Sequence, residues 1–237
     1  MKKKLRIDAP PHIDLSSTKA VGKNGKPLLL FRGEYGSTHG NPQEFQSALG
    51  SVSFGNVKIA NIYTNCEYRY GQALMPRIYP VFLDIQNPVV NWEDCFIEYP
   101  QLVAAVGEEW TVKLLIRYED HVYNTDNWRR INSPVKYDNV ESLAKNAPHL
   151  LEEIYLDIYP ILDDPDFVRE AKSRGFDGAI YNGTGENAMT QEYRIFDQSQ
   201  AIFALTGERA APDLRKAVEL TRMKPRVIVE DDLATSI

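Results

Sequence analysis

Glu192 is the residue of this chain whose type and position best suit catalysis. It follows a glycine-rich run at residues 183–187 and begins a stretch, residues 192–196, in which apolar and polar residues alternate as in a half-buried strand. A carboxylate at the start of a strand, beside a loop able to move, is a usual place for a catalytic group on a rigid support. By residue type alone, a solvated charge is the commoner use of a glutamate.

Arg32 and Gly33 are the first of two upstream groups that favour the catalytic interpretation. They follow a short apolar run at residues 28–31, which predicts a buried strand whose last residues emerge into a loop. Taken alone, Arg32 equally suits an ion pair with Glu34.

Ser51 and Ser53 are the second group. They form a Ser-x-Ser turn ahead of a helix predicted over residues 57–65. By residue type, turn formation or helix capping is the commoner use of such serines. Only the combination of the Arg32 cation, the two serine hydroxyls and the Glu192 carboxylate suggests a catalytic site.

Several other kinds of site are excluded by spacing. The four histidines show no metal-ligand spacing, and the chain has neither a P-loop nor a nucleophile elbow, so we expect no metal. Residues 183–188 satisfy the loose dinucleotide pattern, but a strand is predicted to follow where that motif requires a helix, which excludes a Rossmann site.

Composition sets the broad class. The 237 residues, 43% of them hydrophobic, suffice for one large domain or two small ones, and the net charge of −6 argues weakly against a partner bound through nucleic-acid phosphates. Cys66 and Cys95 lack metal-type spacing and favour a reducing compartment, although a bond between them is left open. The basic residues 2–4 precede no apolar region, and no membrane-spanning run occurs. We therefore expect a cytoplasmic protein without a membrane partner.

The predicted elements indicate an α+β fold. Residues 1–26 predict a flexible N-terminal arm and residues 27–237 a single domain. Residues 77–90 carry the strongest strand pattern, stopped by Asn87 and Pro88, and predict a central strand. Residues 99–175 have helical periodicity and predict an inserted helical block. The remaining predictions are a helix at 45–49, a helix starting at Asp164 and stopping at Arg174 and Gly175, strands at 176–181, 192–196, 201–205 and 227–229, and a helix from 213 to about 222. Strands at both ends with helices between them are typical of the α+β class.

The order of these parts resembles the ADP-ribosyltransferase superfamily, in its arginine, serine, glutamate class. Residues 81–88, 175–181 and 192–200 are similar to the transferase domains of phage and mobile-element polyvalent proteins. The resemblance extends from about residue 27 to residue 205. It implies a split β-sheet core with the helical block inserted into it, and NAD as the substrate.

The resemblance also implies roles for the candidate residues. Cleavage of the nicotinamide–ribose bond passes through an oxocarbenium-like state. Glu192 would hydrogen-bond the ribose hydroxyls and stabilise the positive charge, while Arg32 would hold the phosphate or ribose side of NAD. Gly33 would let the backbone approach the nicotinamide amide. Ser51 would orient Glu192 and the nicotinamide.

The remaining positions bear on NAD binding and on the acceptor. Ser53 would support the serine turn, and Tyr63 would pack its helix beneath the nicotinamide pocket. Val52 replaces the family's usual hydroxyl residue between the serines. Thr190 stands two residues before Glu192, where arginine-modifying members carry glutamate and several others glutamine. The glutamine of this chain, Gln191, is one residue closer to Glu192 than that position. Thr190 and Gln191 are the candidates for positioning the target, whose identity these departures leave open.

The sequence therefore favours a mono-ADP-ribosyltransferase acting on a macromolecule in a cytoplasm, that of a host cell if the phage-like resemblance is informative. A host protein is the favoured acceptor, with nucleic acid left open. Two alternatives remain: an NAD glycohydrolase, and a catalytically silent binding module that uses the helical block as its contact surface. An aromatic and basic cluster in that block suits either the core or a partner contact, with the core favoured by residue type; its members are Tyr118, Tyr123, Trp128, Arg129 and Arg130.

Overall fold

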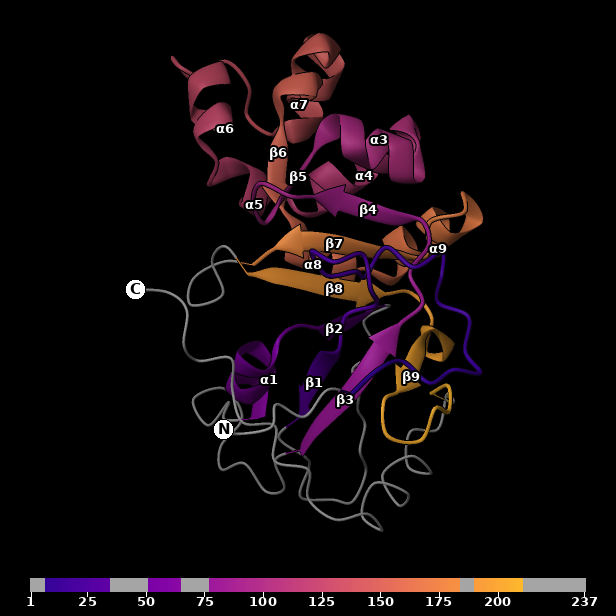
Figure 1. Cartoon of the computed structure of the whole chain (residues 1–237). Helices are drawn as coiled ribbons and strands as arrows, with labels where there is room; N and C mark the ends of the chain where they lie inside the picture. The colour runs from indigo at the N-terminus through magenta and orange to yellow at the C-terminus, as the bar shows by residue number, and fades with distance from the viewer. Residues whose placement is uncertain (1–6, 35–50, 65–76, 184–189, 211–237) are drawn as a thin grey trace, which may run out of the picture.

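The computed structural model describes residues 7–34, 51–64, 77–183 and 190–210 (Figure 1). It confirms the α+β class, with two small sheets below a group of short helices. Several predictions fall outside the described residues: the helix at 45–49, the glycine-rich run beyond Gly183, and both elements expected after residue 210.

The strands form two principal sheets. A three-stranded antiparallel sheet has the order β1 (Leu30–Glu34), β3 (Arg77–Leu83), β9 (Ala201–Phe203). A four-stranded sheet has the order β2 (Val52–Phe54), β8 (Gln191–Ile195), β7 (Gly178–Asn182), β4 (Pro88–Asn91), with only β4 and β7 parallel.

The two sheets adjoin where β1 meets β2. The Phe31 N–H donates to the Gly55 carbonyl at 2.8 Å, and the Gly55 N–H donates back at 3.1 Å. Apolar side chains from both sheets, among them Tyr79, Ile180 and Ile195, form one core between them. The arrangement is that of a single sheet broken between β1 and β2.

The central strand predicted in residues 77–90 is confirmed as β3, which ends at Leu83, before the predicted stop at Asn87 and Pro88. After a break, the residues from Pro88 on form a second strand in the other sheet. The break is stabilised by Asp177, whose carboxylate accepts from the N–H groups of Gln86 at 2.7 Å and Asn87 at 2.9 Å. Pro88 then starts β4, which lies at the end of the four-stranded sheet, whereas β3 is central in its own.

β1 also differs from its prediction. The strand runs from Leu30 to Glu34, so Arg32 and Gly33 lie within it, opposite Tyr79 and Ile78, instead of in a following loop. Helix α1 (Val57–Thr64) agrees with its prediction as far as the structure describes it.

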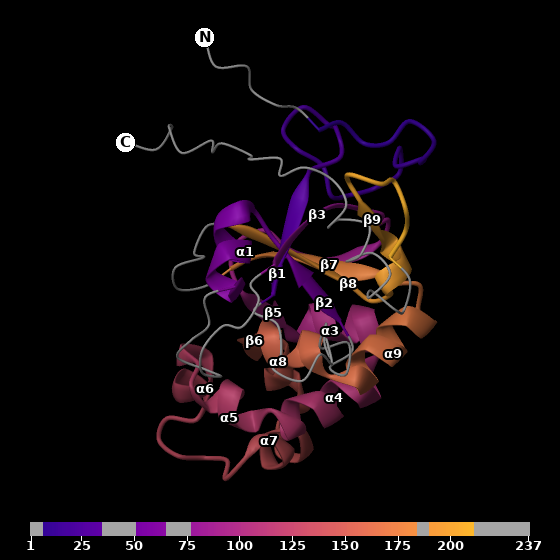
Figure 2. The same ribbon diagram turned by 90° about the horizontal axis from the view of Figure 1, so that it is seen from below.

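The helical periodicity of residues 99–175 is confirmed by helices that cover one face of the four-stranded sheet (Figures 1 and 2). They are α3 (Tyr99–Val106), α4 (Glu108–Arg117), α5 (Glu119–Tyr123), α6 (Asp126–Ile131), α7 (Val140–Asn146), the 3₁₀ helix η2 (Pro148–Glu153), α8 (Ile158–Asp163) and α9 (Pro165–Ser173). A short antiparallel pair, β5 (Phe96–Glu98) and β6 (Tyr155–Asp157), lies among them and was not predicted. None of the helices in the described ranges combines the length and apolar content needed to cross a bilayer.

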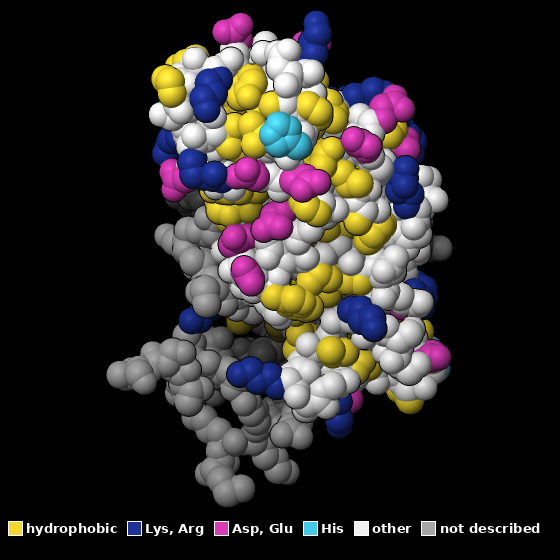
Figure 3. Space-filling model, turned by 90° about the horizontal axis from the view of Figure 1, so that it is seen from above, with side chains coloured by type: hydrophobic (Ala, Val, Ile, Leu, Met, Phe, Trp, Pro, Cys, Tyr) yellow, Lys and Arg dark blue, Asp and Glu magenta, His cyan; other side chains and the backbone are white. Residues whose placement is uncertain are grey.

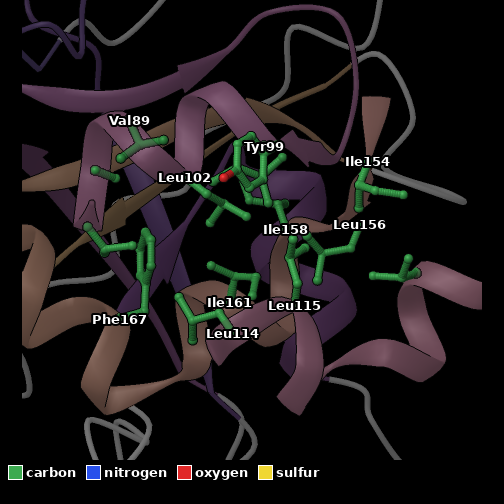
Figure 4. Close-up of a cluster of buried hydrophobic side chains, with 14 of the residues drawn as sticks. Val89, Tyr99, Leu102, Leu114, Leu115, Ile154, Leu156, Ile158, Ile161 and Phe167 are labelled. Carbon is green, nitrogen blue, oxygen red and sulfur yellow. The ribbon is translucent and has the colours of Figure 1, made fainter. Parts of the chain in front are cut away.

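The helical block has its own hydrophobic core, which extends onto the sheet (Figure 4). Leu102, Leu114 and Phe167 are fully buried and belong to one cluster with Val89 of β4 and Ala179 of β7. Burying each such side chain contributes about 1.5–3 kcal/mol. The four-stranded sheet is therefore covered on both faces, by the other sheet and by the helices.

The aromatic and basic cluster divides between core and surface. Trp128 is 7% exposed and packs 4.9 Å from the Tyr123 ring, which confirms the core interpretation for these aromatic side chains. Arg129 and Arg130 are exposed and pair with Asp126 and Glu153. Seen from above, this part of the surface mixes hydrophobic side chains with charges of both signs (Figure 3).

The described part of the predicted flexible arm, residues 7–26, packs against β3 (Figures 1 and 2). Thr18 Oγ1 donates to the Leu83 carbonyl at 2.7 Å, and the Lys19 N–H donates to the Ile85 carbonyl at 2.6 Å. Leu15 and Ala20 are buried. These contacts attach the segment to the sheet.

Asp164 caps α9, as its sequence predicts, and also joins three segments of the block. Its side chain is 2% exposed, accepts from the Asp166 and Phe167 N–H groups, and binds Arg117 and the Tyr118 hydroxyl. We expect Asp164→Ala to lower the free energy of unfolding by about 2–4 kcal/mol, because it removes a cap and leaves buried donors unpaired. Urea unfolding measures this. Asp126→Ala, at an 88% exposed carboxylate, is the control and should cost less than about 1 kcal/mol.

The same carboxylate makes stability depend on pH. Burial disfavours its charge, but hydrogen bonds from Tyr118, Arg117 and two backbone N–H groups outweigh burial and lower the pKa of Asp164. Because the folded state has the lower pKa, this contribution is present above about pH 4 and is lost as the pH falls further. The stability difference between wild type and Asp164→Ala should therefore shrink between pH 7 and pH 3; an unchanged difference would contradict this assignment.

Candidate site between the sheet and the helical block

Glu192 and Arg194 lie on one face of the four-stranded sheet. Side chains alternate along a strand, and Val52, Tyr193 and Ile195 point into the core between the sheets. Glu192 and Arg194 of β8 therefore point the other way, toward the helical block. The spacing of Glu192 and Arg194, two positions apart on a strand, is the sequence signal that both charges share one face of the sheet.

Glu192 is fully buried, so the interpretation as a solvated charge is wrong. Its position near the start of a strand is confirmed, as the second residue of β8. The Tyr159 hydroxyl of α8 donates to Oε1 at 2.9 Å, and the Tyr181 hydroxyl of β7 donates to Oε2 at 3.5 Å. The two tyrosine rings pack edge to face, with centroids 5.5 Å apart. The Glu192 carboxylate is thus shielded from solvent and bound by two tyrosine hydroxyls.

Arg194 is the second buried charge, and the sequence did not single it out. Its Nη1 donates to Asp163 Oδ1 at 2.5 Å and to Ser51 Oγ at 3.2 Å, while its Nε donates to the Tyr181 hydroxyl at 3.1 Å. Burial disfavours the charge of this 6% exposed side chain, but Tyr181 and Asp163 outweigh burial and raise the pKa of Arg194. Arg194 therefore stays charged. It connects Ser51 to Tyr181, which is a hydrogen-bond partner of Glu192.

The serine stretch is a strand where a turn was predicted. Ser51 lies directly before β2, and Ser53 lies within it, opposite Arg194. Ser51 Oγ donates to the Leu162 carbonyl of α8 at 2.6 Å. Ser53 Oγ is buried and has no hydrogen-bond partner within the part of the chain that the structure describes.

Arg32 approaches this face across the break between the sheets. Its Nη1 donates to the Ser53 carbonyl at 3.0 Å, and its Nε lies 3.4 Å from Glu34, the ion pair that the sequence left open. Burial lowers the pKa of Arg32; Glu34 opposes this, and the charge of Arg194 adds to it. Arg32 and Arg194 are therefore close enough to repel one another.

The structure gives Gly33 a packing role. A Cβ at this position would lie 2.9 Å from the Ala60 Cα and closer still to the Ala60 carbonyl, so only glycine lets α1 pack on β1. On α1, Tyr63 is half-buried and near enough to Arg32 and Tyr181 to raise the pKa of both.

The two candidates for target positioning lie at the start of β8. Thr190 is half-buried, and its carbonyl accepts from the Gly183 N–H at 2.9 Å. Gln191 Oε1 accepts from the Tyr193 hydroxyl at 2.8 Å. Thr190 thus helps to hold the ends of β7 and β8 together near Glu192, whereas the Gln191 side chain bonds within β8.

A small cavity lies on the opposite face, between the two sheets. It is lined mainly by apolar side chains, together with Arg32 and Gln198. Glu192 does not line it. Arg32 is thus the candidate residue shared by the cavity and the polar face.

Taken together, the structure links Ser51 to Glu192 by hydrogen bonds and places Arg32 against the nearby Ser53 carbonyl. Arg32 contacts Ser53, Ser51 contacts Arg194, and Arg194 reaches Glu192 through Tyr181. Arg194, Asp163, Tyr159 and Tyr181 were missed; the last three carried no local signal. Within the described ranges, no group of three or more His, Cys, Asp or Glu side chains could hold a metal ion.

The fold and this network define an α+β protein with a buried carboxylate and guanidinium between a broken sheet and a helical block. Comparison of the chain with protein-family models, with curated proteins and with solved structures found no match.

Proposed function

We propose that this chain is a mono-ADP-ribosyltransferase, which cleaves NAD and transfers ADP-ribose to a macromolecule. The observation that supports it most is that residues far apart in sequence meet here: Ser51 is linked to Glu192 through Arg194 and Tyr181, and Arg32 on the adjoining strand donates to the Ser53 carbonyl. A core that merely needed filling would not require two arginines, a serine and a glutamate at this place.

The broken sheet also supports the proposal. The sequence resemblance implies a split β-sheet core, and here the three-stranded and four-stranded sheets meet between β1 and β2. The break separates the strand of Arg32 from the strands of Ser53 and Glu192, and the Arg32 side chain crosses it. A substrate bound at the break would therefore meet residues of both sheets.

The chemistry requires a negative group beside the ribose. As the bond between ribose C1′ and the nicotinamide nitrogen breaks, the bonding electrons leave with nicotinamide and positive charge develops on the ribose. Glu192, in a site from which water is excluded, would stabilise that charge more strongly than a solvated carboxylate could. A nucleophile on the acceptor then bonds to C1′ and loses a proton.

The other residues would hold NAD in place. Arg32 supplies a planar cation suited to a phosphate oxygen. The buried Ser53 Oγ supplies a hydrogen-bonding group beside it, which a bound ligand would satisfy. Ser51 is oriented by Arg194 and by the Leu162 carbonyl, so its hydroxyl direction is fixed before substrate arrives.

One observation favours a second candidate, the catalytically silent binding module. Glu192 is completely buried and hydrogen-bonded by two tyrosines, as a purely structural carboxylate would be. In that case the polar network only holds the helical block against the sheet, and NAD is not consumed.

An assay with NAD distinguishes these functions. The purified protein is incubated with NAD labelled in its adenylate part and a cell lysate, and both nicotinamide release and label on macromolecules are followed, with Glu192→Gln as the control. Label that appears with wild type and not with the variant supports the transferase. Nicotinamide release without transferred label indicates an NAD glycohydrolase instead. Neither signal, across several lysates, would reject both enzymes in favour of the binding module.

A further inference from the structure

Tyr159 links the helical block to the proposed catalytic carboxylate. It is the second residue of α8, whose start is capped by Asp157 Oδ1 accepting from the Tyr159 N–H at 3.1 Å. Its hydroxyl donates to Glu192 Oε1 at 2.9 Å. Tyr159 is only partly buried whereas Glu192 is fully buried, so its side chain extends from the surface to the carboxylate.

The position of the Tyr159 ring is fixed by the same residues that form the network. The ring packs edge to face on Tyr181 with an interplanar angle of 87°, and the Arg194 guanidinium lies 6.0 Å from its centre. Tyr181 is itself a hydrogen-bond partner of Glu192, and Arg194 binds both Tyr181 and Ser51. The orientation of Tyr159 is therefore coupled to the carboxylate and to the serine hydroxyl.

We propose that Tyr159 is a positioning residue of the proposed transferase site, which fixes the rotation of the Glu192 carboxylate through its hydroxyl. This inference rests on the proposed function. Its physical basis is that a catalytic carboxylate acts only in a narrow range of orientations toward the ribose, and that a hydrogen bond from a packed ring restricts this range at little entropic cost. The helical block then completes the site as well as covering the sheet.

The decisive variant is Tyr159→Phe, which removes the hydroxyl and retains the ring contacts. We expect kcat for nicotinamide release to fall by roughly 10- to 100-fold, with the KM for NAD changed less than about threefold, because such orienting partners act on the reacting group more than on substrate binding. A merely structural tyrosine would not produce this split between kcat and KM.

Tyr155→Phe is the matched control. Tyr155 lies four residues earlier, in β6 of the same block, is partly buried, and packs its ring 5.0 Å from the Phe96 ring. Its kcat should stay within about twofold of wild type, because no group of the proposed site contacts it in the described structure. Urea unfolding of both variants establishes that rates refer to folded protein.

Each outcome decides the inference. A selective fall of kcat in Tyr159→Phe supports it. Wild-type kcat in Tyr159→Phe, or a change confined to KM, overturns it while leaving the proposed function in place. Absence of nicotinamide release from wild type would instead overturn the proposed function, and this inference with it.

Discussion

Glu192→Gln is expected to lower the rate of nicotinamide release from NAD by on the order of 10²–10³-fold, the effect of removing one group that stabilises a developing charge. The amide has the size of the carboxylate, and its oxygen can still accept from the Tyr159 hydroxyl, so the packing of this fully buried side chain is retained. The charge is lost, and one acceptor oxygen of the carboxylate becomes an NH₂ donor. The effect should therefore appear in kcat, measured from initial rates of nicotinamide release.

A matched control separates this effect from a general loss of activity. Glu93 is an exposed glutamate whose side chain makes no contact with the network in the described structure, and Glu93→Gln should keep the wild-type rate. Full activity in Glu192→Gln would remove this carboxylate from the mechanism. Loss of circular dichroism in the variant would mean that Glu192 is needed for the fold.

Gly33→Ala is expected to cost about 3 kcal/mol or more of unfolding free energy, at the upper end of what overpacking produces. The added Cβ would meet the backbone of Ala60, and neither partner moves freely. Gly33 is held in β1 opposite Ile78, and Ala60 lies inside α1. Relief would require α1 to move away from β1, which we expect to show as a lower urea midpoint.

Gly22→Ala tests whether the effect is specific. There the closest atoms to an added Cβ belong to the flexible side chains of Leu28, at 3.2 Å, and Asn24, at 3.3 Å. We expect a change of less than about 1 kcal/mol, because side-chain ends can move aside. Equal stability of Gly33→Ala and wild type would show that α1 does not pack on β1 as described.

Elements whose signals are local could be predicted from the sequence. Asp164 followed by proline marked the start of α9, and Gly175, with a φ of 87°, lies just beyond its end. Alternation placed the strand that carries Glu192, and the α+β class followed from strands on either side of a helical stretch. These features depend on residues only a few positions apart, so local sequence patterns are enough to predict them.

The candidate site could be predicted only in part. Arg32, Ser51 and Glu192 were named from the chain, but their environment was not: Arg32 lies inside a strand, Ser53 lies in a strand instead of a turn, and Glu192 is buried. The hydrogen bond between Glu192 and Tyr159 depends on α8, which lies about 30 residues from Glu192 in the chain.

Which segments pair and which charges are buried depends on contacts between residues far apart in the chain. The sequence indicated a stop at Asn87 and Pro88, but not that the residues after it join another sheet. There the Asp177 carboxylate, distant in sequence, binds the N–H groups between β3 and β4. Likewise, Arg194 is charged in the interior because Asp163 and Tyr181 converge on it from other elements. Pairing and desolvation are set by groups distant in sequence, and local periodicity contains no information about their distances.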